Sequence, residues 1–366
     1  MHYPSYYLLL DIIIWNVLFF SIVWRVIKCH IRNLPITYKE KNVYRIYFLF
    51  FVLFAVFAFH TGDFRHYYEG VNEIYKFKAY SHMEEVYNWL VFLVKGNYYL
   101  WRLIVWSLFF ILLYLTLKRM GTDNYLSLLF FVGMLLPSSV EGRYSLGMMI
   151  LVYGFVLFLT SKGFRKILSC AIIIVSFFFH KSIILILLLI PLSFVKITKK
   201  RLVLMLLLFP VVLSLFNSAI TSVFSQVGIW TSLIDEGARK AYFDNETEMG
   251  SSFGLRILWS FWYIVYIALL LFLVIRNMKN ERKVYLFAMI SLSFFICYAS
   301  FVLYASVLDN YTVSRRYFML MPYPLIPIVS LYLKENFIST ASFKWMLFTF
   351  FVWQNYYMLL QMYYFS

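Results

Sequence analysis

The stretch LWRLIVWSLFFILLYLTLKR, residues 100–119, is an apolar run that ends in two adjacent basic residues. A helix needs about 20 predominantly apolar residues to cross the hydrocarbon core of a bilayer. Basic residues gather in the short loops on the cytoplasmic side of a membrane. The stretch therefore predicts a spanning helix over 100–117 that is followed, in the cytoplasm, by Lys118 and Arg119.

Apolar runs of similar length recur along the whole chain. The 366 residues are 63% hydrophobic and 14% charged, with a mean hydropathy of +0.77, whereas a soluble protein of this size exposes far more charge. We therefore expect an all-α polytopic membrane protein with about twelve transmembrane helices, in a single integral membrane domain over 1–366. The predicted spans are 6–27, 45–60, 100–117, 124–139, 144–161, 166–180, 182–196, 202–219, 254–275, 284–304, 317–333 and 343–363.

The charged residues separate onto the two sides of this topology. Alternate loops hold 21 of the 33 basic residues, and these loops are placed in the cytoplasm by the positive-inside rule. The other side holds 12 of the 17 acidic residues, so it is close to neutral. The net charge of +16 thus reflects orientation in a membrane and not nucleic-acid binding. Both termini are expected outside the cytoplasm.

Two polar segments on the outer side, about 61–99 and 220–253, are longer than a connection requires. The first contains the amphipathic run 84–95, which is too short to span and is expected to lie at the membrane interface. The cytoplasmic loops lack a Walker A sequence and an acidic pair that could hold a metal with a nucleotide sugar. We expect no metal and no cofactor, and chemistry on the outer face, with its energy supplied by an activated lipid substrate.

Arginines stand at the start of three predicted helices that enter from outside: Arg143, Arg256 and the pair Arg315 and Arg316. A cation at a helix N-terminus is unfavourable by roughly 0.3–1 kcal/mol, because the helix dipole favours anions there. The arrangement is explained if a phosphate lies among these guanidinium groups, since both arginine and helix N-termini bind phosphate. The alternative is that each arginine snorkels to the interface or pairs with a nearby carboxylate.

His180 ends the predicted helix 166–180, with Lys181 beside it. A histidine at this position is suited to act as a general base near neutral pH. The neighbouring ammonium group would keep the imidazole neutral, as a base requires. The alternative is an ordinary interface residue flanked by aromatic side chains.

Carboxylates and aromatic side chains accompany these cations on the outer side. Asp63 follows the second predicted span, and Glu84 and Glu85 open the amphipathic run. Each could serve as a base, accept a hydrogen bond from a sugar hydroxyl or pair with an arginine, and the alternative is a solvated loop carboxylate. Outer tyrosines such as Tyr67 could stack on sugar rings.

The order of these motifs along the chain resembles the EpsG-type family of exopolysaccharide and O-antigen polymerases, often called Wzy. The resemblance covers roughly residues 40–335. This chain has Tyr144 where the family usually has Gln, and it lacks the usual Pro and Gly after the acidic residue. The matching motifs are Gly62 to Tyr67 with Asp63, the acidic pair Glu84 and Glu85, Arg143 with the small residues that follow it, His180 with Ser182, and Arg316 with Tyr317.

The resemblance implies a GT-C-like enzyme of the bacterial cytoplasmic membrane that joins undecaprenyl-diphosphate-linked oligosaccharide repeat units on its outer face. The implied partners are this lipid-linked donor and acceptor, membrane lipid and a chain-length regulator, without nucleic acid. His180 is assigned to proton removal from the acceptor, with Asp63 as the second candidate and Arg143 as a further catalytic residue. Diphosphate and glycan binding are assigned to Arg143, Arg256, Arg315, Arg316, Lys181, Tyr67, Glu84, Glu85 and Tyr317.

Three other functions remain open from the sequence. An O-antigen ligase shares the donor chemistry but uses a finished lipid core as acceptor. A membrane O-acetyltransferase needs a cytoplasmic route for its acyl donor, which the short loops do not provide. A non-enzymatic flippase of lipid-linked oligosaccharides should carry cations deep within its spans, whereas here the cations cluster at one face.

Overall fold

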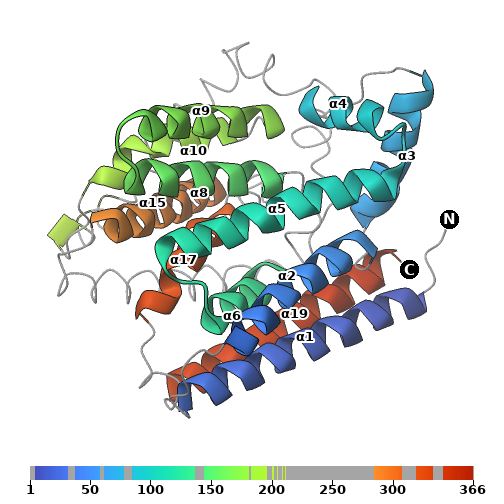
Figure 1. Ribbon diagram of the computed structural model, residues 1–366, viewed down its shortest axis with the longest axis horizontal. Helices are drawn as coiled ribbons and strands as arrows, with labels where there is room; N and C mark the ends of the chain where they lie inside the picture. Colours follow the sequence, from blue (N-terminus) through green and yellow to red (C-terminus); the bar gives the residue numbers. More distant parts are fainter. Residues whose placement is uncertain are drawn as a thin grey trace. The chain divides into compact units, whose positions relative to one another are not determined.

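The computed structural model (Figure 1) describes residues 5–31, 38–57, 62–77, 85–136, 144–180, 183–195, 284–306, 319–332 and 341–365, and a few isolated positions between 200 and 211. This part of the chain is all-α, as predicted, and contains no strand. Its α-helices are α1 (Ser5–Ile31), α2 (Tyr38–Phe57), α3 (Gly62–Phe77), α4 (Glu85–Leu93), α5 (Tyr98–Met120), α6 (Tyr125–Met134), α8 (Tyr144–Thr160), α9 (Phe164–Phe179), α10 (Ile183–Leu189), α15 (Val284–Ser306), α17 (Pro322–Tyr332) and α19 (Ala341–Phe365), with a 3₁₀ turn η1 (Pro191–Phe194).

The chain divides into two compact units, which are described separately. The first unit comprises Met1–His180 and Ile326–Ser366, and the second comprises Lys181–Leu325. The first unit contains α1 to α6, α8, α9 and α19, and in Figure 1 its long helices α1, α2 and α19 lie side by side.

Helices α1 and α19 of the first unit are antiparallel. Asn16 on α1 and Asn355 on α19 exchange two hydrogen bonds, of 2.7 and 3.1 Å. One turn further along α1, the ring of Phe20 lies 5.5 Å from that of Phe351. Because the residue numbers rise on one helix and fall on the other, the start of α1 and the end of α19 lie at the same end of the unit, in agreement with the prediction that both termini share a side.

Helices α5 and α8 run in the same direction, and α9 runs in the opposite direction against α8. Arg119 at the end of α5 donates hydrogen bonds to Thr160 and Ser161 at the end of α8. At the other end of α8, the ring of Tyr144 lies 6.1 Å from that of His180. Gly154 allows α8 and α9 to approach closely, because an added Cβ would lie only 3.1 Å from the backbone nitrogen of Ile173.

These contacts gather basic residues of α1, α2, α5 and α9 at one end of the first unit. We call it the basic end, where Arg25, Glu40, Lys118 and Arg165 lie, and we call the other the His180 end, where α5 and α8 begin and α9 finishes. The relative directions of the helices agree with the alternation that the charge pattern predicted. That the basic end faces the cytoplasm remains a prediction of the positive-inside rule.

Two helices of the described residues are long and apolar enough to cross a membrane. They are Leu9–Cys29 within α1 and Tyr98–Met120, which is α5, and they correspond to the predicted spans 6–27 and 100–117. Helices α15 and α19 cover the predicted spans 284–304 and 343–363. The predicted span 254–275 and most of 202–219 lie outside the described residues, so the number of twelve spans stays a prediction.

The structure differs from the predicted spans in two places. The span 182–196 is interrupted, because α10 ends at Leu189 and Pro191 begins a 3₁₀ turn; proline lacks the N–H that a continuing helix needs. Within the span 124–139, α6 ends at Met134 and Leu135 has a φ of −125°, and residues 137–139 lie outside the described part.

The polar segment after the second span contains a helix that the sequence did not reveal. Helix α3 buries Val71 and Ile74 on one side and exposes Tyr68 and Tyr75 on the other. The short helix α4 matches the predicted amphipathic run 84–95, with Tyr87 and Val91 buried and Trp89 exposed.

Candidate functional site

A tight turn brings α4 back against the beginning of α5 at the His180 end. Gly96 in this turn has a φ of +73°, and an added Cβ would lie 2.9 Å from Cβ of Tyr75 on α3. Asn97 then caps α5 by accepting a hydrogen bond of 3.0 Å from the backbone N–H of Leu100. The turn thus holds α3, α4 and α5 together where α5 begins.

Arg102 is buried in the first turns of α5, with 4% of its surface exposed. Its Nη1 donates a hydrogen bond of 3.1 Å to the hydroxyl of Tyr98, and its guanidinium carbon lies 5.7 Å from the centre of the same ring. Its Nε has no hydrogen-bond partner among the described residues. A guanidinium is always charged in proteins, and an unsatisfied donor on a buried charged group is costly. Among the described residues, the Nε–H of Arg102 therefore still needs an anionic or neutral acceptor.

An aromatic wall surrounds the helix turn that carries Arg102. We define it as Tyr68, Tyr87, Tyr98, Trp101 and Phe179, which come from α3, α4, α5 and α9. The ring centres are 5.5 Å apart for Tyr68 and Tyr98, 6.1 Å for Tyr98 and Trp101, 5.7 Å for Trp101 and Tyr87, and 6.0 Å for Tyr87 and Phe179. The wall is a continuous series of ring contacts from α3 across to the end of α9.

His180 follows directly after the last ring of this wall. Its backbone is extended, with φ −161° and ψ 114°, and its N–H donates to the carbonyl of Phe177 at 3.2 Å. The imidazole is half-buried and lies edge-on to the ring of Tyr144, which opens α8. The prediction that His180 closes this helix is confirmed, and the fold brings it to the same end as Arg102.

Comparison with known protein families identifies the chain. The sequence model of the EpsG family matches residues 41–366, which is most of the chain. The chain belongs to the EpsG family. Membership indicates a membrane protein of polysaccharide biosynthesis and, in general terms, a polymerase of glycosyltransferase type. No curated protein and no solved structure matches the chain.

Most of the site residues predicted for this EpsG-family protein are not covered by the structure. Asp63 and Tyr67 lie on α3 and Glu85 is the first residue of α4, but only their backbone is described. The structure thus brings three of the predicted segments to the His180 end without testing the roles of their side chains. The predicted residues outside the described part are Glu84, Arg143, Lys181, Arg256, Arg315, Arg316 and Tyr317.

Two buried charged residues of this EpsG-family chain were not singled out from its sequence. Arg102 is the only Lys, Arg, Asp, Glu or His within the run 100–117, and Asp11 lies within the first predicted span. Both are 4% exposed. Ionisable residues inside spans are costly and mark functional sites, so this signal was available in the sequence. Among the described residues, no group of three His, Cys, Asp or Glu side chains could hold a metal ion.

Proposed function

We propose that this EpsG-family protein joins oligosaccharide repeat units carried on a polyprenyl diphosphate, at the outer face of the bacterial cytoplasmic membrane. The growing chain is the donor and the incoming lipid-linked repeat is the acceptor. The acceptor hydroxyl attacks the anomeric carbon of the donor, the bond from this carbon to the diphosphate oxygen breaks, and the lipid diphosphate leaves. The His180 end is the face on which this transfer takes place.

The observation that carries the proposal is the buried guanidinium of Arg102 beside the aromatic wall. Among the described residues Arg102 has no anionic partner and its Nε has no acceptor, and a phosphate oxygen would supply both. Aromatic rings such as Tyr98 present apolar faces on which sugar rings can stack. A cation and a ring surface at one end of the bundle suit a substrate that joins a diphosphate to a glycan.

Negative charge develops on the departing diphosphate in this reaction. Preorganised arginines stabilise that charge more in the transition state than in the ground state, which accelerates the transfer. We assign this role to Arg143, Arg256, Arg315 and Arg316, and add Arg102 as a further diphosphate ligand. No metal is needed, because the arginines supply the neutralising charge.

The remaining groups position and activate the acceptor. His180 accepts the proton of the attacking hydroxyl, and Asp63 is the second candidate for this role. Contacts to the glycan and diphosphate are assigned to Lys181, Tyr67, Glu84, Glu85 and Tyr317.

The decisive experiment is the glycan profile of a deletion strain, followed by reconstitution. A strain without this protein should make one capped repeat and no longer polymer, whereas complete loss of glycan would indicate a ligase or a flippase. The purified protein should then polymerise lipid-linked repeats with chelator present and no nucleotide added. Inhibition by the chelator would contradict the metal-independent mechanism.

A further inference from the structure

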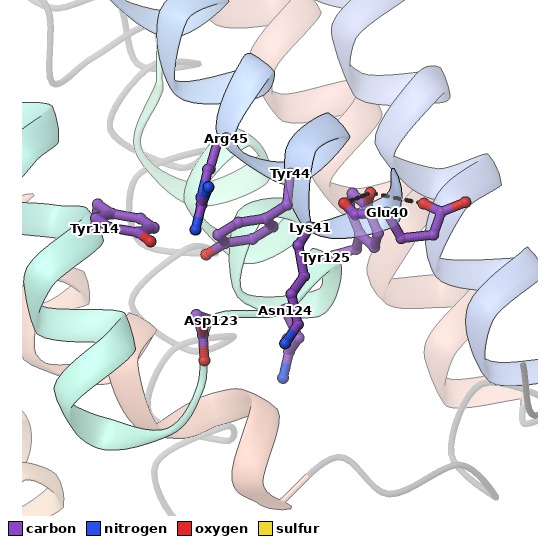
Figure 2. Close-up of a pocket in the computed structure, with 8 residues that line it drawn as sticks. All are labelled: Glu40, Lys41, Tyr44, Arg45, Tyr114, Asp123, Asn124 and Tyr125. Atoms are coloured by element: carbon purple, nitrogen blue, oxygen red, sulfur yellow. Dashed lines mark hydrogen bonds between the residues drawn. The ribbon is translucent and has the colours of Figure 1, made fainter. Parts of the chain in front are cut away.

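A pocket opens at the basic end of the first unit, far along α2 and α5 from the His180 end. It lies between the start of α2, the end of α5 and the turn that leads into α6 (Figure 2). Its volume is about 210 Å³, many times the roughly 10–15 Å³ that one water molecule requires. The lining residues are Glu40, Lys41, Tyr44, Arg45, Tyr114, Asp123, Asn124 and Tyr125.

One wall of the pocket is a closed network around Glu40. Its carboxylate accepts hydrogen bonds of 2.9 and 3.1 Å from Nη1 of Arg25 and of 2.9 Å from the hydroxyl of Tyr125. The ammonium of Lys28 lies 3.6 Å away. The charge of Glu40 is therefore compensated within the protein, and this wall holds α1, α2 and α6 together.

The cations of the pocket itself are not compensated in this way. Lys41 and Arg45 are exposed, stand one helical turn apart on α2, and form no ion pair or hydrogen bond with another described residue. Figure 2 shows both side chains at the pocket, together with those of Asp123 and Asn124. The pocket thus presents two cations and the carboxylate of Asp123, which forms no ion pair with another described residue.

A buried hydroxyl in this pocket lacks an acceptor. Tyr44, just before the predicted span 45–60, is 6% exposed, and its hydroxyl has no hydrogen-bond partner among the described residues. Burial, with a further contribution from Asp123, raises the pKa of Tyr44 well above its usual value, so the phenol keeps its proton at neutral pH. Figure 2 shows its ring between Arg45 and Asp123. A ligand oxygen would satisfy this donor, which is otherwise unfavourable to bury.

An exposed apolar surface continues from the pocket along both helices. On α2, Leu49 and Leu53 follow Arg45 at four-residue spacing and are 59% and 41% exposed. On α5, Ile111 and Leu115 flank the lining residue Tyr114 and are 54% and 37% exposed. The acyl chains of a lipid can pack on such an apolar surface, whereas a soluble phosphate compound has no apolar chain to cover it.

We infer that this pocket binds the phosphate headgroup of an anionic phospholipid such as phosphatidylglycerol, with its acyl chains along α2 and α5. Lys41 and Arg45 hold the phosphate, and the Tyr44 hydroxyl donates to a headgroup oxygen. The carboxylate of Asp123 accepts a hydrogen bond from a headgroup hydroxyl. The inference does not depend on the proposed polymerase activity, because it uses none of the residues assigned to that reaction.

The test compares two variants that remove the same charge from the same end of the unit. The pocket variant combines Lys41→Gln with Arg45→Gln, and the control combines Lys162→Gln in the turn after α8 with Arg165→Gln in the first turn of α9, both exposed. The full-length protein is titrated in detergent with phosphatidylglycerol or phosphatidylcholine, and bound lipid is counted by native mass spectrometry. We expect wild type and control to prefer phosphatidylglycerol, and the pocket variant to bind it at least about tenfold more weakly.

A single-atom variant covers the case in which the pocket variant does not fold. Tyr44→Phe keeps all charges and should weaken phosphatidylglycerol binding by about two- to tenfold. Equal losses in the pocket and control variants, or no preference for phosphatidylglycerol in wild type, would overturn the inference. Displacement of the lipid by millimolar inorganic phosphate would overturn its lipid part and assign the pocket to a soluble phosphate compound.

Discussion

At the basic end of the first unit, Glu40 binds Arg25 and Tyr125, whereas at the His180 end the guanidinium of Arg102 donates, among the described residues, only to the hydroxyl of Tyr98. Both ends are rich in tyrosine, so the difference lies in the charges. The compensated charge of Glu40 holds three helices together. The charge of Arg102 has no anionic partner among the described residues, so it contributes less to folding and can bind an anion, and this contrast between Glu40 and Arg102 can be tested at each end.

The largest expected effect is on catalysis, at the His180 end. Arg102→Met should reduce polymer formation by about 100- to 1000-fold, because one donor to the developing diphosphate charge is lost. The unfolding temperature should stay the same or rise, since replacing an incompletely paired buried charge by an apolar group is often neutral or stabilising. Polymer yield per folded protein and thermal unfolding in detergent measure the two effects.

Arg119→Met is the matched control on the same helix, because Arg119 donates hydrogen bonds to Thr160 and Ser161 at the basic end and to no other described residue. It should leave polymer formation unchanged. A lower unfolding temperature for Arg102→Met, with activity that falls only in proportion to folded protein, would show that Arg102 is structural and would remove the contrast between the ends.

The opposite behaviour is expected at the basic end. Glu40→Gln should lower the free energy of unfolding by roughly 1–3 kcal/mol, because Arg25 and Lys28 lose their partner in a partly buried network. Polymer formation per folded protein should not change. Thermal unfolding and the reconstituted reaction provide the two measurements, and a selective loss of activity would contradict the structural role of this network.

The next effect concerns the proton acceptor at the His180 end. If His180 is the base, the rate should fall about tenfold for each pH unit below roughly 6.5, where histidine ordinarily titrates. His180→Gln should abolish this acid limb of the rate profile, whereas Asp63→Asn should keep it. A pH profile in which Asp63→Asn is inactive and His180→Gln retains the limb would assign the base to Asp63.

The smallest effect is expected between the two ends, where a neutral pair joins α1 to α19. Asn355→Leu removes the two hydrogen bonds to Asn16, and interhelical hydrogen bonds in membrane proteins average about 0.6 kcal/mol. Unfolding in detergent should detect a decrease of that size without loss of activity. A decrease as large as that of Glu40→Gln would mean that charge compensation is not what distinguishes the basic end.

The long spans could be predicted because length and hydropathy alone determine them, as α5 and α1 show. The interruption at Pro191 was missed because the apolar run continues on both sides of the proline. Helix α3 was missed because, among its residues whose side chains are described, only Val71 and Ile74 are buried. They pack in a fold where α3 contacts α4, α5 and α19, whereas the sequence of the segment alone resembles a polar loop.

The site was predicted only in part, for a similar reason. His180 ends its helix as predicted, because an apolar run followed by a polar residue is a local signal. The burial of Arg102 depends on Tyr98 within its own helix and on ring contacts from α3, α4 and α9, which no local pattern contains. Counting charges by side of the membrane placed Arg102 on the outer side but did not reveal that it is buried.

The interruption after α10 has a consequence for the hydration of the backbone in the second unit. Carbonyl groups released from a helix cannot face hydrocarbon and need a protein or water partner. Here Ser193 donates a hydrogen bond of 2.5 Å to the carbonyl of Ile190, and Ser291 on α15 donates one of 3.5 Å to that of Val195. The hydroxyls of two buried serines thus take the place of water as hydrogen-bond donors to these carbonyls. If both serines were replaced by apolar residues, water would have to enter beside η1 to bond the same carbonyls.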